Sequence, residues 1–152
     1  MSWEKAVGFG VDIPFVTLLG FELTQFDGGH SEILYTAKPE HLNSFSVTHG
    51  GALMTLLDVS MATAARSQVP EMGVVTIEMK TTFMRPAVGQ LIAKGELMHH
   101  TVTMAFTQAT VFDAHGHKCA HATGTFKFMK RLPTGHRTAN PLNGPSNTIR
   151  TD

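Results

Sequence analysis

Residues 41–66 read HLNSFSVTHGGALMTLLDVSMATAAR, and this stretch decides how the rest of the chain is arranged. From Ala52 to Ala65 nearly every residue is a helix former or a small residue, with no Pro or Gly. Apolar side chains point in all directions around such a helix, so we expect it to be buried on most of its faces. At about 1.5 Å per residue it is too short to cross a bilayer, which favours the central helix of a protein core.

Two polar features interrupt this apolar helix. Asp58 lies in its middle, and a carboxylate in a buried helix is costly unless a hydrogen bond or a functional site compensates for it. His49, Gly50 and Gly51 stand where the helix begins. Paired glycines let a ligand approach the backbone, and the N–H groups of a helix N-terminus favour negative charge, so this end can stabilise an oxyanion. A simple turn is the alternative interpretation of the two glycines.

The spacing of these features limits how they could cooperate. Gly50 and Asp58 are eight residues apart, about 12 Å along a helix. A carbonyl group and its attacking water need both groups within roughly 3 Å of the reacting atoms. If Gly50 and Asp58 share a site, that site must therefore be built across a two-fold dimer, with one residue from each subunit.

The combined pattern of Asn43, His49-Gly50-Gly51 and Asp58 resembles the hotdog-fold thioesterases of the phenylacetic-acid-degradation (PaaI-like) type. Residues 74–87, VVTIEMKTTFMRPA, look like the strand that follows in this family, and the resemblance covers about residues 15–130. One departure is Ser46, where family members often carry Gly. This difference concerns the shape of the loop and the fit of the substrate more than the chemistry.

The resemblance implies hydrolysis of an acyl-CoA thioester to a free acid and CoA. In that scheme the Gly50 N–H polarises the carbonyl across the dimer interface. Asp58 of the facing subunit acts as a general base on water or as a nucleophile, and the sequence leaves both roles open.

Three further residues complete the expected catalytic set. The resemblance implies that Thr76 orients the water beside Asp58 and that Asn43 assists at the carbonyl or the water. An ordinary strand threonine and a turn residue are the alternatives. We expect His49 to hold its loop through a hydrogen bond. It lies nine residues from Asp58, too far for a His–Asp dyad within one chain.

The phosphates of CoA need cations, and charged side chains at strand ends could reach a solvent-exposed nucleotide. The acyl group would enter the dimer seam near the helix, although its apolar residues could equally be plain core. The candidate cations are Arg85, Lys127, Lys130 and Arg131, and the candidate acyl walls are Met54, Leu57 and Met61.

Composition excludes several classes of protein. The length of 152 residues predicts one domain, and the 12 basic and 12 acidic residues give no surface suited to nucleic acid or a membrane. The one cysteine, Cys119, cannot form an intramolecular disulfide; we expect it to be a small buried residue and the location to be cytoplasmic. His115, His117 and His121 lack the spacing of metal ligands, so we expect neither a metal site nor a cofactor apart from the CoA of the substrate.

The strand pattern supports the same fold independently of the motif. Two strands before the helix and about four after it favour an α+β fold, with an antiparallel sheet wrapped around one long helix. Residues 1–130 are predicted to form this single domain, and residues 131–152, rich in Pro, Gly and Asn, a flexible tail. The predicted strands are 18–26, 31–37, 74–84, two within 91–111 with a bend near His99-His100, and 118–129.

Other functions remain compatible with the sequence. A hotdog hydratase or dehydratase would need a His and a carboxylate that converge on one carbon. A non-catalytic acyl-CoA binding protein would use the same pocket, and a purely structural oligomer would use Asp58 only as a hydrogen-bonding residue. The dimer follows from the geometry of the site, whereas a homotetramer follows from the resemblance alone.

Overall fold

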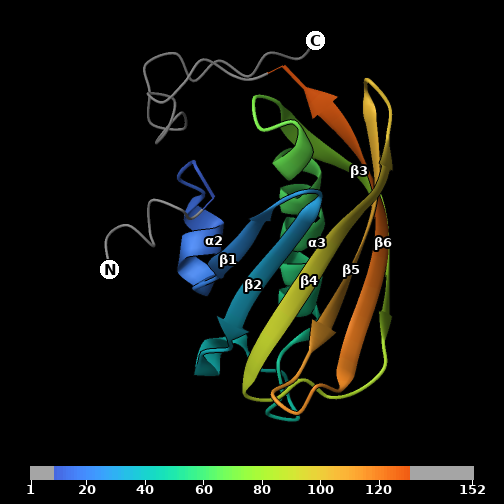
Figure 1. Ribbon diagram of the computed structural model, residues 1–152. Coiled ribbons are helices and arrows are strands. Elements are labelled where there is room, and N and C mark those ends of the chain that lie inside the picture. The colour runs from blue at the N-terminus through green and yellow to red at the C-terminus, as the bar shows by residue number, and fades with distance from the viewer. Residues whose placement is uncertain (1–8, 131–152) are drawn as a thin grey trace.

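The computed structural model describes residues 9–130 (Figure 1). In chain order its elements are α2 (Pro14–Leu19), β1 (Glu22–Asp27), β2 (His30–Thr36), the 3₁₀ helix η1 (Pro39–His41), α3 (Gly50–Gln68), β3 (Gly73–Phe83), β4 (Gln90–His100), β5 (Met104–Phe112) and β6 (Lys118–Met129). The predicted tail, including Arg131, lies outside the described residues.

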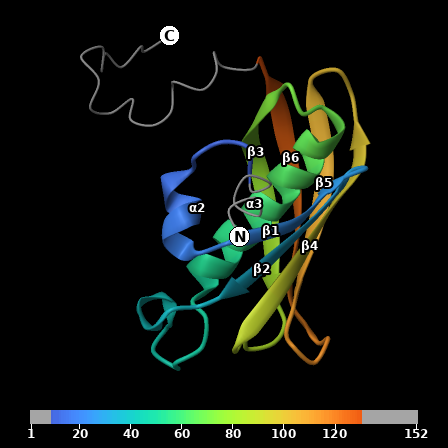
Figure 2. The same ribbon diagram turned by 60° about the vertical axis from the view of Figure 1, so that its left-hand side comes forward.

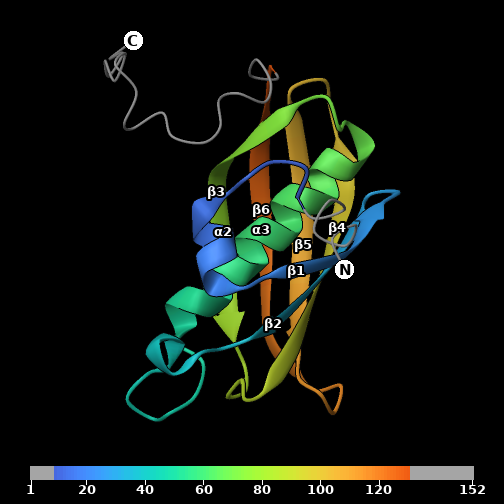
Figure 3. The same cartoon turned by 90° about the vertical axis from the view of Figure 1, so that its left-hand side faces the viewer.

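The six strands form one antiparallel sheet in the order β1-β2-β4-β5-β6-β3. Figures 1 and 2 show the sheet curving around α3, which runs along its inner face. The shorter helix α2 lies beside the N-terminal half of α3 (Figure 3). The predicted α+β architecture of a sheet wrapped around one long helix is therefore confirmed.

Most element boundaries agree with the sequence-based prediction to within two residues, but the first strand was predicted too long. Residues 18–21 are not part of it, because Leu18 and Leu19 belong to α2. This helix has Pro14 at its first position, and Gly20 ends it in a left-handed conformation with φ of 79°. The central helix also begins two residues earlier than predicted, because both glycines lie in its first turn.

Helix α3 is buried or half-buried on most of its faces, as the sequence predicted. Leu53, Leu57 and Met61 face the sheet and are at most 3 % exposed. Met54 on another side is 40 % exposed, and Asp58 is half-buried. The polar residue therefore stands at the border of the apolar face in this single chain.

Halfway along α3, the helix approaches the sheet unusually closely. The hydroxyl of Ser31 on β2 donates a 2.6 Å hydrogen bond to the carbonyl of Ser60 on α3. Gly95 on β4 lies against the same carbonyl, and a Cβ atom at this position would overlap both serines. This contact fixes the position of α3 along the sheet.

Strand β3 forms one end of the sheet, and its outer edge has no neighbouring strand within residues 9–130. It is 11 residues long and carries exposed apolar side chains: Val75 is 45 % exposed and Ile77 54 %. Long apolar edge strands are surfaces on which another strand can pair.

Neither of the α-helices within residues 9–130 has the length and apolar character that a membrane span requires.

Candidate active site

The N-terminus of α3 presents one backbone N–H that is available to a ligand. His49 caps the helix: its ring Nδ1 accepts a 2.8 Å hydrogen bond from the N–H of Gly51, and its carbonyl accepts from Ala52 and Leu53. Within residues 9–130 the N–H of Gly50 makes no hydrogen bond. The cap therefore uses the neighbouring donors and leaves that of Gly50 for an incoming oxygen.

The loop before the helix is held by its own polar groups. The side-chain oxygen of Asn43 accepts hydrogen bonds from the N–H groups of Phe45 at 2.8 Å and Val47 at 3.2 Å. The oxygen of this amide is thus used inside the loop, as in the turn-residue alternative. The amide nitrogen has no partner within the described residues and is the part of Asn43 that could contact a substrate.

Ser46 has a left-handed backbone conformation with φ of 59°. It is also the position at which members of the resembled family often carry Gly. An L-residue is strained in this region, whereas Gly is not. The loop therefore keeps the conformation that suits glycine even though it carries serine.

Asp58 and Thr76 meet between α3 and β3. The hydroxyl of Thr76 donates a 2.6 Å hydrogen bond to Oδ1 of Asp58. Within residues 9–130, the other carboxylate oxygen of Asp58 has no hydrogen-bond partner. The pair therefore leaves one carboxylate oxygen of Asp58, held in a fixed orientation, free to bind a ligand or a partner beside β3.

Gly50 and Asp58 lie on the same continuous helix, so about 12 Å of helix axis separates them. Strand β3 runs past both. Thr76 contacts Asp58, and at the other end of β3 the ring of Phe83 would lie 3.4 Å from a Cβ atom placed on Gly50. The two expected halves of the site are therefore at opposite ends of one edge strand.

The candidate cations are exposed, and they too lie at opposite ends of β3. Arg85 lies two residues after Phe83, the end of β3, and its backbone N–H donates a hydrogen bond to the carbonyl of Cys119. Lys127 on β6 pairs with Val75, at the end of β3 near Asp58, and Lys130 follows β6. One chain alone does not gather these three charges around one ligand.

Two of the three candidate acyl walls are core residues. Leu57 and Met61 are fully buried between α3 and the sheet, and Met54 alone of the three is exposed. Cys119 is also fully buried, and burial raises the pKa of its thiol, so it is a poor nucleophile. Among residues 9–130, no cluster of three His, Cys, Asp or Glu side chains could hold a metal ion.

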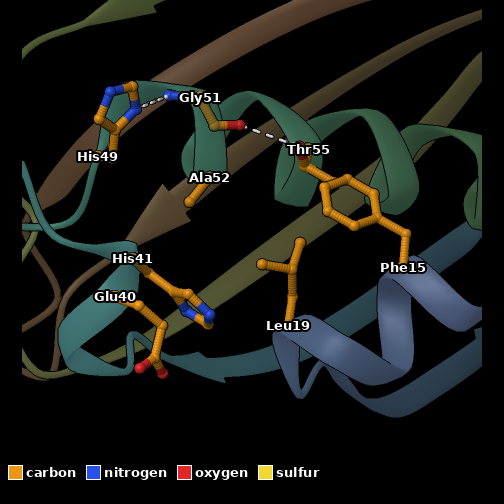
Figure 4. Close-up of a pocket in the computed structure, with 8 residues that line it drawn as sticks. All are labelled: Phe15, Leu19, Glu40, His41, His49, Gly51, Ala52 and Thr55. Atoms are coloured by element: carbon orange, nitrogen blue, oxygen red, sulfur yellow. Dashed lines mark hydrogen bonds between the residues drawn. The ribbon is translucent and has the colours of Figure 1, made fainter.

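A pocket of about 220 Å³ opens beside the N-terminus of α3 (Figure 4). Its apolar walls are Phe15 and Leu19 of α2 and Ala52 of α3. Polar groups of η1 and of the helix cap, including His41 and His49, also line it. The sequence did not predict this pocket, because α2 and η1 carry no motif and meet α3 only in the folded chain.

His41 is the residue in this pocket to which the sequence analysis gave no role. Its Nδ1 lies 2.7 Å from the hydroxyl of Tyr35 and accepts a 3.2 Å hydrogen bond from the N–H of Lys38. The tyrosine and histidine rings are also stacked, with centroids 5.8 Å apart. A histidine close after a strand tyrosine is too common a pattern to have indicated this pair.

Comparison with known proteins gives the family. The model of the thioesterase superfamily matches residues 45–120, which is half of the chain, and the chain belongs to this superfamily. A Halobacterium salinarum protein named "Putative esterase" is 33% identical over 91 residues, which are 54% of this chain and 60% of that relative. The chain thus matches less than two thirds of that relative's length.

Solved structures show the same fold. The PaaI protein of the E. coli phenylacetic acid degradation operon superposes with a TM-score of 0.77 at 21% identity, over 86% of this chain and 95% of that one. The protein smu.793 from Streptococcus mutans, bound to acetyl CoA, gives a TM-score of 0.68 at 23% identity, over 74% and 90%. The chain has the hotdog fold, and its resemblance to PaaI-like proteins is confirmed.

Proposed function

We propose that this protein is a thioesterase that hydrolyses an acyl-CoA to a free acid and CoA, at sites shared between two subunits. Its membership of the thioesterase superfamily supports hydrolysis of a thioester. The observation that carries the proposal is the path of β3, which joins the Asp58–Thr76 pair at one end to the free N–H of Gly50 at the other.

A second copy of the chain would bring these two halves together. In this assembly β3 pairs antiparallel with β3 of the partner. The two-fold axis passes near Met79 and Lys80, which lie midway along the strand between Thr76 and Phe83. Such an axis places Asp58 of one subunit beside Gly50 of the partner, and forms two sites. The exposed apolar edge of β3 supports this assembly.

In the proposed reaction, the Gly50 N–H and the helix N-terminus stabilise negative charge on the carbonyl oxygen. As a general base, Asp58 takes a proton from water as its oxygen adds to the carbonyl carbon, and returns it to the departing CoA sulfur. As a nucleophile, Asp58 instead attacks the carbonyl carbon, and the C–S bond breaks to give an anhydride and the CoA thiolate, which takes a proton from solvent. Water then cleaves the anhydride to the free acid and restores Asp58. In either case Thr76 holds the carboxylate in one orientation.

The same two-fold axis would gather the cations for CoA. It moves Arg85 of one subunit toward the end of β3 where Lys127 and Lys130 of the partner lie. Mixed Arg and Lys charges at a sheet rim suit phosphate groups. The acetyl CoA bound by the Streptococcus mutans protein supports a CoA thioester as ligand. A homotetramer, a single domain over residues 1–130 and a cytoplasmic location remain part of the proposal.

Release of free thiol from a panel of acyl-CoAs tests the activity. We expect turnover by the wild-type chain to collapse in Asp58→Asn and Asp58→Ala, by at least about 100-fold, because both remove the carboxylate chemistry. Each variant is compared with wild type at matched oligomeric state. Release that is indifferent to Asp58 would contradict the catalytic assignment, and acyl-CoA binding without release would favour a non-catalytic binding protein.

Complementation between two inactive variants tests whether the site is shared. Gly50→Pro removes the N–H at the first helical position, where Pro is tolerated, and His49 already has the extended conformation that precedes Pro. Gly50→Ala is the matched control, because it keeps the N–H and its Cβ meets Phe83 at an ordinary contact distance.

We expect Gly50→Pro and Asp58→Asn to be inactive alone and to recover activity when co-refolded. Random mixing makes half of the dimers mixed, each with one complete site, so about a quarter of wild-type activity returns. Gly50→Ala should stay active by itself. No recovery, with mixed dimers demonstrated by mass spectrometry, would mean that each site lies within one chain.

A further inference from the structure

The pocket beside α2 lies next to the proposed carbonyl position. Gly51, one residue after Gly50, lines it, together with Ala52 from the same turn. Consecutive Cα atoms are about 3.8 Å apart, so the pocket begins one residue from the Gly50 N–H that would hold the carbonyl. Figure 4 shows Phe15 and Leu19 pointing from α2 toward α3, with the ring of Phe15 beside Thr55.

The size of the pocket limits what it can hold. Its volume is about 220 Å³. A cavity of about 150 Å³ holds a benzene ring. The pocket therefore accommodates a group of about six carbons with one or two additional heavy atoms, and a long fatty chain would extend beyond it.

The hydrogen bonds of His41 favour one of its two tautomers. Nδ1 makes both contacts of this ring, with the Tyr35 hydroxyl at 2.7 Å and with the backbone N–H of Lys38 at 3.2 Å. The Lys38 N–H can only donate, so this contact favours the tautomer with its proton on Nε2, in which the Tyr35 hydroxyl also donates to Nδ1. Burial raises the pKa of Tyr35, which keeps this hydroxyl protonated. Held in this way, His41 offers its Nε2–H as a donor in the pocket that it lines.

The charge at the pocket further restricts the ligand. Glu40 lines the same pocket and is exposed. A negatively charged group on the acyl chain would come close to this carboxylate and be disfavoured. A neutral oxygen, as in a ketone, an ether or a hydroxyl group, accepts a hydrogen bond from His41 without that penalty.

We infer that this pocket binds the acyl group of the substrate and that His41 donates a hydrogen bond to a neutral oxygen near the far end of a compact acyl group. The inference rests on the proposed function and gives it an acyl chemistry. Tyr35 is a positioning residue here, because it acts only through His41.

Matched thioesters test this assignment. In the first pair, 5-oxohexanoyl-CoA carries a ketone oxygen that hexanoyl-CoA lacks. In the second pair, 4-methoxybenzoyl-CoA carries a methoxy group, with its ether oxygen, that benzoyl-CoA lacks. We expect wild type to have the higher kcat/KM for the oxygenated member of each pair that fits. In His41→Phe this preference should fall roughly three- to tenfold, the effect of one hydrogen bond. His115→Phe, on the exposed β5–β6 turn, is the matched control and should keep the preference.

A measurement on the wild-type chain covers the case in which His41→Phe does not fold. Long-range ¹⁵N–¹H NMR of histidine-labelled protein should show His41 protonated on Nε2 at neutral pH. Its Nε2 signal should shift on addition of 5-oxohexanoic acid and much less with hexanoic acid. A proton on Nδ1, or equal shifts with both acids, would overturn the role of His41.

The remaining outcomes separate this inference from the proposed function. Asp58-dependent thiol release with an unchanged preference in His41→Phe overturns the inference alone. A KM that rises equally for every thioester shows that the pocket holds the CoA part, and overturns the acyl assignment. No release from any thioester by wild type overturns the proposed function, and the acyl subsite with it.

Discussion

Thr76 holds the carboxylate of Asp58 in one orientation through a 2.6 Å hydrogen bond. The spacing of these residues along the chain does not predict this contact, because α3 ends and β3 begins between them. The expectation that Thr76 lies beside the acid came from the family resemblance. Its catalytic role stays a prediction, and substitutions of the hydroxyl can test it.

We expect Thr76→Val to lower kcat about 10- to 100-fold with little change in KM, because the carboxylate loses its orientation while the binding surfaces remain. Thr76→Ser keeps the hydroxyl and should retain most of the activity. Steady-state kinetics on the best thioester measures both variants. Wild-type turnover by Thr76→Val would show that the hydroxyl is only a strand residue.

Ser46 makes a prediction about stability. Its φ of 59° is unfavourable for serine, so Ser46→Gly should raise the free energy of unfolding by about 0.5–1 kcal/mol, despite the greater freedom of Gly in the unfolded chain. Ser44→Gly, in the same loop but without a positive φ, should lower it. Urea unfolding of the three chains decides; equal effects of both glycines would contradict the strain argument.

Among the elements, the strands were the most predictable. Alternating apolar residues and the glycines at 28, 29 and 116 set their ends, and these glycines do have positive φ values of 58°, 82° and 81°. The error over residues 18–21 arose because Leu18 and Leu19 suit a strand as well as a helix. Only the Pro14 start and the Gly20 end distinguish the two, and both signals are brief.

Asp113 in the β5–β6 turn should make the stability of the fold depend on pH. The backbone N–H of His117 holds the pKa of Asp113 below its ordinary value of 3.8, assisted by the N–H of His115 and the ring of His117. A carboxyl group with a lowered pKa stabilises the fold above its unfolded pKa, and this is lost as pH falls through the folded pKa. We expect Asp113→Ala to melt below wild type at neutral pH.

The difference in Tm should shrink as the solution is acidified below the ordinary pKa of Asp113. Calorimetry of both chains between neutral pH and strong acid measures it. A constant difference across that range would show that the side chain acts through its shape alone. His115→Ala, which keeps the backbone N–H, is expected to follow wild type.

At the scale of the whole molecule, we expect thioesterase activity to require the dimer. Dilution separates dimers, so the specific activity of wild type should fall at low concentration. Ile77→Lys, which places a charge on the exposed edge of β3, should give an inactive monomer. Val102→Lys, at a 92 % exposed apolar residue outside β3, should remain dimeric and active.

Sedimentation velocity and thiol release on the same samples check this prediction. An active Ile77→Lys monomer would contradict the shared site. The sequence could indicate the need for two subunits, because helix geometry alone separates Gly50 from Asp58. It could not indicate the pocket beside α2, since Phe15, His41 and Ala52 come from three elements that meet only when the chain is packed.

The close contact of Ser60 with Ser31 and Gly95 holds the middle of α3 against the sheet, so that any tilt of the helix would turn about this point, the pivot. Asp58 is two residues from this pivot, whereas Gly50 is ten residues away, on a lever arm of about 15 Å. A tilt of about 5° would leave the carboxylate almost still but swing the Gly50 N–H by about 1.3 Å, enough to impair catalysis. We therefore expect turnover to depend on the bonds that restrain the N-terminal end of α3, such as the hydrogen bond from the Thr48 N–H to the carbonyl of Ala87, although these groups do not contact the proposed substrate.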